Sequence, residues 1–164
     1  MEFVFPVTAF GAASLKKSFE ASAPPAKDYA KNLSRLSPDE FQGFMKGFID
    51  LVIRHREKWY ILDYKTNFLG DTYAHYSGQS MAGAMAEHHY FLQYYLYTAA
   101  LHKYLDSRMA AYDYDTHFGG VFYLFVRGMH PDFGPESGVF FHRPSKKAIQ
   151  AFSGKVSRPF ETEY

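Results

Sequence analysis

The chain has 164 residues, a length typical of one domain rather than two. Hydrophobic residues make up 47% and charged residues 21%, which excludes an intrinsically disordered chain. The 18 Lys and Arg residues nearly balance the 17 Asp and Glu residues, which excludes a uniformly basic nucleic-acid binder but leaves room for a local basic groove. Cysteine is absent, so disulfides, cysteine-bound zinc, iron–sulfur clusters and a thiol nucleophile are excluded.

The first half of the sequence predicts three strands. Residues 2–10 read as a strand, and residues 11–42, with three prolines and weak periodicity, predict a loop with one short helix. Residues 43–54 and 58–66 predict two strands joined by a short polar turn, hence a hairpin. Because both strands carry apolar residues at odd and even positions, we expect them to be buried on both faces, in a sheet with helices on each side.

The second half predicts a long helix followed by further strands. A Gly/Asp/Tyr-rich loop precedes one continuous helix over residues 79–106. Residues 118–127 and 139–143 predict two more strands, and Ser145 is placed to cap a last helix that ends near residue 152. This order predicts an α/β fold with a mixed sheet, in which residues 1–164 form a single domain.

No stretch of the sequence approaches the roughly 20 apolar residues of a membrane span. The N-terminal segment lacks the basic residues and the cleavage site of a signal peptide. We therefore expect a cytoplasmic protein that makes no membrane contact.

Two acidic residues lie within apolar segments. Asp50, in GFIDLV, would be costly if ionised and buried, unless a positive group meets it, and a strand end that reaches solvent is an equally good interpretation. Asp63 and Lys65 share one face of their strand while Tyr64 points to the other, but Asp-x-Lys alone is common as a surface ion pair.

The combination of these residues is more informative than each motif alone. Two adjacent strands each deliver a carboxylate, and one of them also delivers a lysine. Two carboxylates, a carbonyl and waters suit Mg²⁺, which can clamp a phosphodiester and lower the pKa of a bound water. A neighbouring lysine can position that water or offset negative charge in the transition state. The pattern therefore favours phosphodiester hydrolysis.

Gln93 and Tyr97 lie four residues apart in the predicted long helix and share one of its faces. From spacing alone, an ordinary amphipathic flank is the better interpretation. The functional alternative places both side chains above the ion and the phosphate backbone.

The motifs GFID, DYKTN and QYYLY, in this order, resemble the G-x-x-D, D-Y-K-[ST] and Q-x-x-x-Y motifs of RecB-type nucleases, a branch of the PD-(D/E)xK superfamily. The likeness extends to EFVFPV, MKGFIDLV, the stretch from DYKTNFLG to LYTAALHKYL, and YDYDTHFGGVFYLFVRG, and so covers most of the chain. These segments resemble the C-terminal nuclease domains of RecB subunits in RecBCD helicase–nucleases (exodeoxyribonuclease V). The resemblance implies a restriction-endonuclease-like mixed β-sheet flanked by helices, without the N-terminal helices of the full domain.

The resemblance also implies roles for individual residues. Asp50 and Asp63 are implied as metal ligands, the Tyr64 carbonyl as a further ligand and Lys65 as the catalytic lysine. The expected cofactor is Mg²⁺, for which Mn²⁺ can substitute.

Other family features are matched in part. Gln93 and Tyr97 correspond to the helix motif, and Glu2 corresponds to an acid near the N-terminal strand of the family. The family's histidine metal ligand comes from upstream helices for which we find no matching segment. No G-x-x-x-x-G-K-[ST] motif is present, so the sequence predicts no P-loop ATP site.

The function implied is that of a Mg²⁺-dependent exodeoxyribonuclease domain acting in double-strand break repair, recombination and DNA degradation. The expected partners are single-stranded DNA ends fed by a helicase, the RecC and RecD subunits, and the RecA recombinase. The alternative is a catalytically incomplete fragment that serves as a protein-interaction module for partner subunits or RecA. A stand-alone nuclease of another branch, such as a resolvase, is disfavoured by the likeness outside the motifs.

Three aromatic residues lie in the loop that follows the expected catalytic strand: Phe68, Tyr73 and Tyr76. Such rings could stack on unpaired bases. With 17 Phe and 14 Tyr in the chain, core packing is the default interpretation for each of them.

Overall fold

The computed structural model describes residues 1–10, 12–35 and 41–153. The first half contains β1 (Glu2–Phe10), α1 (Ala12–Glu20), α2 (Ala26–Tyr29), the 3₁₀ helix η1 (Asn32–Arg35), β2 (Phe41–Phe48), β3 (Leu51–His55) and β4 (Lys58–Lys65). The second half contains η2 (Tyr73–Tyr76), α3 (Gly78–Glu87), α4 (Tyr90–Arg108), α5 (Tyr114–His117), β5 (Phe118–Phe125), η3 (Val126–Gly128), η4 (Pro131–Phe133), β6 (Val139–His142) and α6 (Lys146–Ser153).

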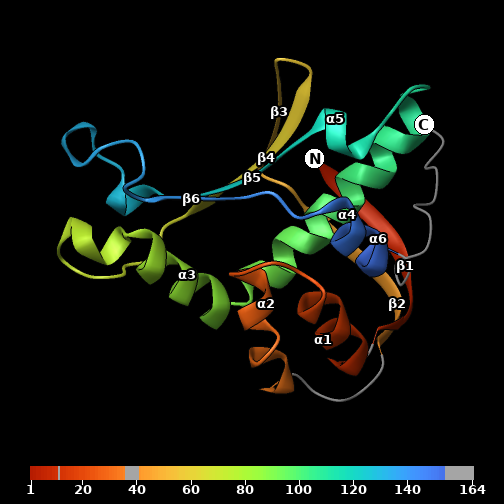
Figure 1. The fold of residues 1–164 in the computed structure, drawn as a ribbon, viewed down its shortest axis with the longest axis horizontal. Coiled ribbons are helices and arrows are strands. Elements are labelled where there is room, and N and C mark those ends of the chain that lie inside the picture. The colour runs from red at the N-terminus through yellow and green to blue at the C-terminus, as the bar shows by residue number, and fades with distance from the viewer. Residues whose placement is uncertain (11, 36–40, 154–164) are drawn as a thin grey trace.

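The strands form two sheets (Figure 1). β1 and β2 form an antiparallel pair, and the second sheet has the order β3-β4-β5-β6. In that sheet β4 and β5 are parallel while the other two pairs are antiparallel, which confirms the predicted mixed sheet. The predicted strand over residues 43–54 is in fact two strands, because the chain leaves the first sheet after β2 and enters the second at β3.

The predicted hairpin is confirmed by the antiparallel pairing of β3 with β4. Its two-residue turn has positive φ at both positions, 46° at Arg56 and 66° at Glu57, which matches the right-handed twist of the paired strands. An ion pair between Arg54 and Glu57 closes the turn.

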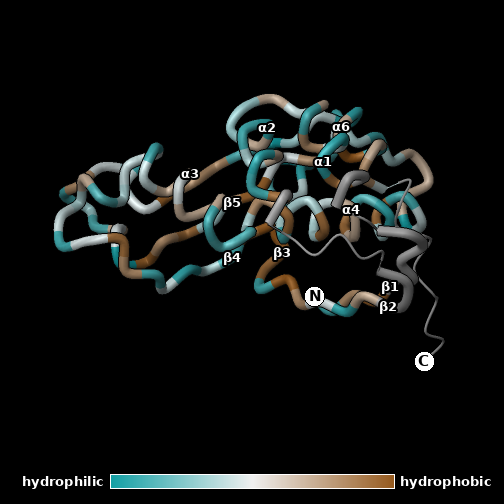
Figure 2. Tube along the Cα trace, turned by 90° about the horizontal axis from the view of Figure 1, so that it is seen from below, coloured by the Kyte–Doolittle hydropathy of each residue, from teal (hydrophilic) through white to brown (hydrophobic). Residues whose placement is uncertain are grey.

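The prediction that both hairpin strands are buried on both faces is wrong for β3, and β4 is buried on one face only. β3 lies at the sheet edge, and most of its side chains are exposed. In the described part of the chain, the labelled helices gather on one side of the strands (Figure 2). The other face, here called the open face, carries Leu51, Ile53, Tyr64 and Phe141 at 37–49% exposure. The apolar residues of the open face contact one another across strands, as in the Phe122–Phe141 ring pair. Apolar residues at both odd and even positions of a strand therefore did not mean that helices cover both faces of the sheet.

The predicted continuous helix over residues 79–106 is two helices. α3 ends at Glu87 and α4 begins at Tyr90, and between them His89 adopts a left-handed backbone with φ 56°. The His89 ring also meets α2, with 2.7 Å between its Nδ1 and Tyr29 Oη. Tertiary contact therefore breaks a segment whose composition favours helix throughout.

Two further expectations have different outcomes. The segment 11–42 holds α1, α2 and η1 and begins β2, so it is more helical than predicted, while residues 36–40 lie outside the described residues. The predicted cap of the last helix is confirmed, because the Ala148 N–H donates to Ser145 Oγ at 3.2 Å and α6 follows directly.

The core is dominated by aromatic side chains between α4 and the sheet. α4 crosses the centre of the molecule (Figure 1) and buries Tyr94 and Tyr95 completely. Phe91 of α4 meets Phe140 of β6, and Phe3 of β1 meets Tyr97, so one helix packs against both sheets. Within the described residues, we find no helix long and apolar enough to cross a membrane.

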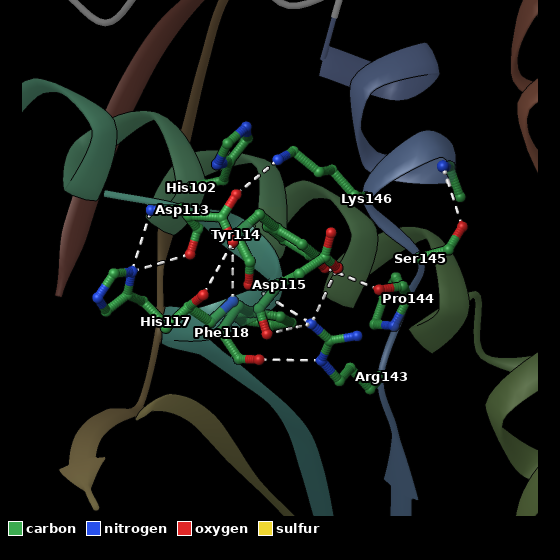
Figure 3. A network of polar contacts seen from close by, with 12 residues as sticks. His102, Asp113, Tyr114, Asp115, His117, Phe118, Arg143, Pro144, Ser145 and Lys146 are labelled. Atoms are coloured by element: carbon green, nitrogen blue, oxygen red, sulfur yellow. Dashed lines mark hydrogen bonds and ion pairs between the residues drawn. The ribbon is translucent and has the colours of Figure 1, made fainter. Parts of the chain in front are cut away.

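A polar network joins the start of β5 to the β6–α6 connection (Figure 3). Asp113 caps α5 by accepting a hydrogen bond from the Thr116 N–H, and its carboxylate lies 2.7 Å from Lys146 Nζ. The hydrogen bonds from Lys146 and Thr116 lower the pKa of the Asp113 carboxyl to about 2. Arg143 donates to the Phe118 carbonyl at 2.9 Å, and the Tyr114 hydroxyl donates to the Pro144 carbonyl at 2.9 Å. The polar groups of this network bond to one another and to backbone carbonyls, which is typical of a structural role.

His142 joins β6 to α4 in a neutral form. Its Nδ1 lies 2.9 Å from Tyr94 Oη, and burial lowers its pKa from 6.5 to about 4. The unfolded chain then binds this proton at a higher pH than the folded chain. The contribution of neutral His142 is fully present above about pH 6.5 and is lost as the pH falls towards 4.

We expect the wild-type protein to lose roughly 3 kcal/mol more unfolding free energy than His142→Gln when the pH is lowered from 7 to 4. Glutamine can accept the Tyr94 hydrogen bond but does not titrate in this range. Urea unfolding of both proteins at the two pH values measures the difference. Parallel pH profiles for the two proteins would contradict a buried, neutral His142.

Candidate active site

Asp50 lies where the chain passes from one sheet to the other. β2 ends at Phe48 and β3 begins at Leu51, so Asp50 belongs to the short link between them. The preceding Ile49 is buried, and its N–H donates to the Met1 carbonyl at 2.8 Å. The Asp50 side chain is exposed and accepts the Tyr64 N–H at 3.1 Å. The link thus holds a solvent-facing carboxylate against β4.

Asp63 is the buried acid of the site. It lies on β4 with only 2% of its surface exposed, and burial raises the pKa of its carboxyl. The neighbouring Lys65 opposes this shift, while the charge of Asp50 adds to it. Lys65 Nζ lies 2.5 Å from Asp63 Oδ2, so the predicted same-face placement of the two side chains is confirmed.

Side chains of α4 complete the surroundings of the lysine. Lys65 Nζ donates to Gln93 Oε1 at 3.0 Å, and Gln93 Nε2 donates to the Tyr97 hydroxyl at 2.9 Å. The structure therefore links Gln93 and Tyr97 to Lys65, while their position above an ion and a phosphate backbone stays a prediction. Burial raises the pKa of the Tyr97 hydroxyl, and the negative charge of Asp63 raises it further.

Two residues of the site were not identified from the sequence. Lys65 Nζ lies 4.0 Å from the centre of the Tyr90 ring and 5.0 Å from that of Tyr123, distances at which aromatic faces attract a cation. The Tyr123 hydroxyl also donates to Gln93 Oε1 at 3.0 Å. Tyr90 precedes Gln93 by three residues, which is a helical signal for a shared face. Tyr123 lies opposite Asp63 in the β4–β5 register, which the sequence does not reveal.

Glu2 lies on β1, beside the end of β2, and makes its ion pair within the ladder of these two strands. In the β1–β2 ladder it lies opposite Phe48, and its exposed carboxylate pairs with Lys46 at 2.5 Å. Tyr64 contributes its backbone N–H to Asp50, while its own ring is 49% exposed on the open face.

The two aspartates have the chemistry of a hard-cation site. Asp63 Oδ2 is buried and, its ion pair with Lys65 apart, meets no hydrogen-bond donor in favourable geometry. A carboxylate oxygen in that state fits a metal ligand. Among the described residues, no cluster of three or more His, Cys, Asp or Glu residues forms, so backbone carbonyl and water oxygens would have to complete the coordination.

Hollows elsewhere on the surface do not include this pair. One of about 440 Å³ lies between α3 and β6, and another of about 480 Å³ lies beside η4. Neither is lined by Asp50, Asp63 or Lys65. The candidate site is therefore described by its charges and contacts.

The sequence profile of the PD-(D/E)XK nuclease superfamily matches residues 7–158. The chain belongs to this superfamily, and its mixed sheet with flanking helices agrees with the expected restriction-endonuclease-like fold class.

The chain is also similar to RecB proteins. It is 53% identical over 110 residues to the RecBCD enzyme subunit RecB of Escherichia coli (strain K12), which covers 67% of this chain and 9% of that protein. It is 50% identical over 116 residues to RecB of Haemophilus influenzae, covering 71% and 9%. It is 38% identical over 156 residues to RecB of Mycolicibacterium smegmatis, covering 85% and 14%. The superfamily match and these relatives confirm the resemblance to RecB-type nuclease domains, although the chain spans only about a tenth of each relative.

The ion pair between Asp63 and Lys65 is expected to show strong energetic coupling. Lys65→Met leaves a buried carboxylate without its cation, and Asp63→Asn leaves a mostly buried ammonium without its anion. Each change should lower the unfolding free energy by about 3 kcal/mol or more. In the double variant neither charge remains, so its loss should be smaller than the sum by at least about 1 kcal/mol.

Urea unfolding of the wild type, the two single variants and the double variant, without divalent cations, measures this coupling. Tyr104→Ala, an exposed substitution on α4, controls for general effects on this helix. Additive losses would show that the close approach of Lys65 to Asp63 has no energetic consequence.

Proposed function

We propose that this chain is a divalent-metal-dependent DNA nuclease domain that hydrolyses phosphodiester bonds, of the exodeoxyribonuclease V type. The observation that carries the proposal is the convergence of Asp50, Asp63 and Lys65 beneath Gln93 of α4. These four residues come from three separate elements or links of the chain, and each lies in a segment that resembles a motif of the superfamily to which the chain belongs.

Asp50 and Asp63 are proposed to hold the metal, together with the Tyr64 carbonyl. Mg²⁺ is the proposed ion, with Mn²⁺ as a substitute, because both accept hard oxygen ligands. When bound, the ion would lower the pKa of a water molecule and stabilise charge on the phosphate. The open position of Asp50 gives solvent and substrate access to the pair, while buried Asp63 presents an oxygen without a full set of donors.

Lys65 is proposed as the catalytic lysine. Its ammonium would orient the attacking water or offset the negative charge that develops on the phosphate. Gln93 accepts a hydrogen bond from Lys65 and donates to Tyr97, so it aims the ammonium from the helix side. Tyr97 would then present its hydroxyl towards the phosphate backbone.

The names of the relatives support a biological setting. We propose that the chain acts within a RecBCD-like helicase–nuclease, with RecC and RecD subunits and RecA as protein partners. It would receive single-stranded DNA ends from the motor, in the cytoplasm, during double-strand break repair and recombination. This setting rests on similarity to proteins of which the chain spans about a tenth.

The open face favours a second candidate function. Leu51, Ile53, Tyr64 and Phe141 expose apolar surface that no described element covers. Exposed apolar faces of this kind commonly contact other proteins. A protein-interaction module without catalysis is therefore the alternative that the experiments must separate from a nuclease.

Calorimetric titration with Mn²⁺ should show saturable binding that Asp63→Ala removes. Lys65→Met should bind Mn²⁺ as well as the wild type or better, because the ammonium competes with the ion for Asp63 Oδ2. On labelled single-stranded DNA with Mg²⁺, the same Lys65→Met variant should lose cleavage by at least about 100-fold. Loss of metal binding and of cleavage together in Lys65→Met would assign this residue a structural role.

The outcome for the wild type decides between the two candidates. Absence of both Mn²⁺ binding and cleavage in the folded protein would refute the nuclease proposal for this chain. The interaction module would then be the better explanation, and substitution of Phe141 on the open face should reduce binding of partner subunits.

Tyr90 is expected to support catalysis by holding the lysine. Tyr90→Leu removes the aromatic face beside Lys65 and should lower the cleavage rate by about 10-fold without a change in Mn²⁺ affinity. Tyr90→Phe keeps that face, loses only the hydroxyl bond to Asn67 Oδ1, and should retain most activity. Single-turnover cleavage by the two variants tests this, and equal loss in both would point to the hydroxyl instead of the ring.

A further inference from the structure

Two loops carry aromatic side chains that face solvent side by side. Tyr73 of η2 is 61% exposed and Phe133 of η4 is 47% exposed. Their rings stack, with centroids 5.2 Å apart and planes inclined by 27°. The His130 ring lies 5.1 Å from that of Phe133. These three rings, here called the aromatic column, come from segments almost 60 residues apart in the sequence and leave flat surface open to solvent.

The two loops are fastened to each other, so the column is preformed. Tyr76 is buried between them, and its carbonyl accepts the Gly138 N–H at 3.2 Å. The Leu69 N–H donates to the Tyr76 hydroxyl at 3.2 Å. A Cβ at Gly128 would lie 2.3 Å from the Tyr76 ring, so only glycine permits this approach. A ligand that stacks on the column would pay little of the usual cost of ordering.

The column lies beyond the strand ends that carry the candidate active site. β4 and β5 are parallel, and Lys65 pairs with Phe125 where both strands end. Arg127 Nε donates to the Thr66 carbonyl at 2.8 Å, which holds the two outgoing segments together. Phe68, 63% exposed, lies on the stretch between Lys65 and Tyr73. Figure 1 shows both loops at the end of the molecule to which these strands lead.

The chemistry around the column favours planar, apolar recognition. Two acids lie near the column, with Asp132 3.6 Å from His130 and Asp71 exposed in the adjacent loop. A hollow of about 480 Å³, lined in part by Met129, His130 and Pro135, borders the column. Flat rings stacked in series are suited to stacking with nucleobases. Aromatic hot spots of protein interfaces, by contrast, typically lie in well-packed, fully desolvated pockets.

We propose that the aromatic column binds unpaired bases of single-stranded DNA and so holds the strand whose backbone passes the candidate active site. This inference deepens the proposed nuclease function by assigning a base-stacking subsite to it. The subsite is insensitive to base identity, because every base offers a π-face. It selects single strands over duplexes, since paired bases do not expose those faces.

The test is binding of fluorescently labelled oligo-dT to the full chain without divalent cations, so that hydrolysis does not consume the probe. Tyr73→Ala and Phe133→Ala should each weaken binding roughly 5- to 100-fold. Tyr73→Trp keeps a stacking face and should bind as the wild type does or more tightly. Tyr104→Ala, a matched change of a tyrosine that is 47% exposed on α4, should leave binding unchanged.

Two further readouts separate stacking from other effects. An oligonucleotide with abasic sites should bind the wild type as weakly as oligo-dT binds Tyr73→Ala. The affinity of Tyr73→Ala should be almost the same for the abasic probe as for oligo-dT. The salt dependence of binding should be the same in Tyr73→Ala and the wild type, because no phosphate contact is removed. Thermal unfolding of each variant confirms that these exposed substitutions leave the fold intact.

Several outcomes would overturn the inference. Binding by Tyr73→Ala and Phe133→Ala that equals the wild type would do so. An equal loss in Tyr104→Ala would show a non-specific effect, and a dimer that Tyr73→Ala dissociates would reassign the column to protein contact. The proposed nuclease activity fails separately: a wild type that binds oligo-dT through the column but never cleaves it with Mg²⁺ or Mn²⁺ leaves the subsite and removes the nuclease.

Discussion

A carboxylate buried on β4 sets the requirement that the surrounding structure meets. Asp63 is nearly inaccessible to solvent, and its burial would favour the uncharged form if no cation were near. Lys65 supplies that cation from the same strand face, and Gln93 of α4 accepts a hydrogen bond from it. The rings of Tyr90 and Tyr123 enclose the ammonium. Some of the contacts that pack α4 on the sheet thus also prepare the candidate site.

Asp50 depends on a different constraint, the passage of the chain between two sheets. The β1–β2 ladder continues to Ile49, whose N–H and carbonyl meet Met1, and the chain then turns into β3. This placement leaves Asp50 exposed beside a strand whose Asp63 is buried. One acid is therefore accessible to solvent and the other is sheltered. A cation bound between the two acids could take water ligands on the Asp50 side and protein oxygen ligands on the Asp63 side.

The predictable features were those encoded by local patterns. Alternation along β4 placed Asp63 and Lys65 on one face, and the helical period placed Gln93 with Tyr97. The failures involved tertiary context. Nothing local to residues 43–54 marks the crossing between sheets, and the left-handed His89 is held by contact with Tyr29 of α2. Tyr123 joined the site through the β4–β5 register, which pairs it with Asp63, 60 residues earlier in the sequence. Glu2 pairs with Lys46, and the role that the family resemblance implies for it stays a prediction.

The parallel pairing of β4 with β5 would let the proposed hydrolysis and the proposed strand binding share one edge of the sheet. Parallel strands send their following loops in the same direction, so the segments after Lys65 and Phe125 leave together. The β4 strand brings the charged groups, while the loops after both strands bring exposed rings. Tyr76 is buried between those loops, and its carbonyl accepts the Gly138 N–H. A strand of DNA held by its bases beyond this edge would keep its backbone free to reach Asp50 and Lys65. Stacking and hydrolysis then require different atoms of the same nucleotide chain, so the two sites do not compete.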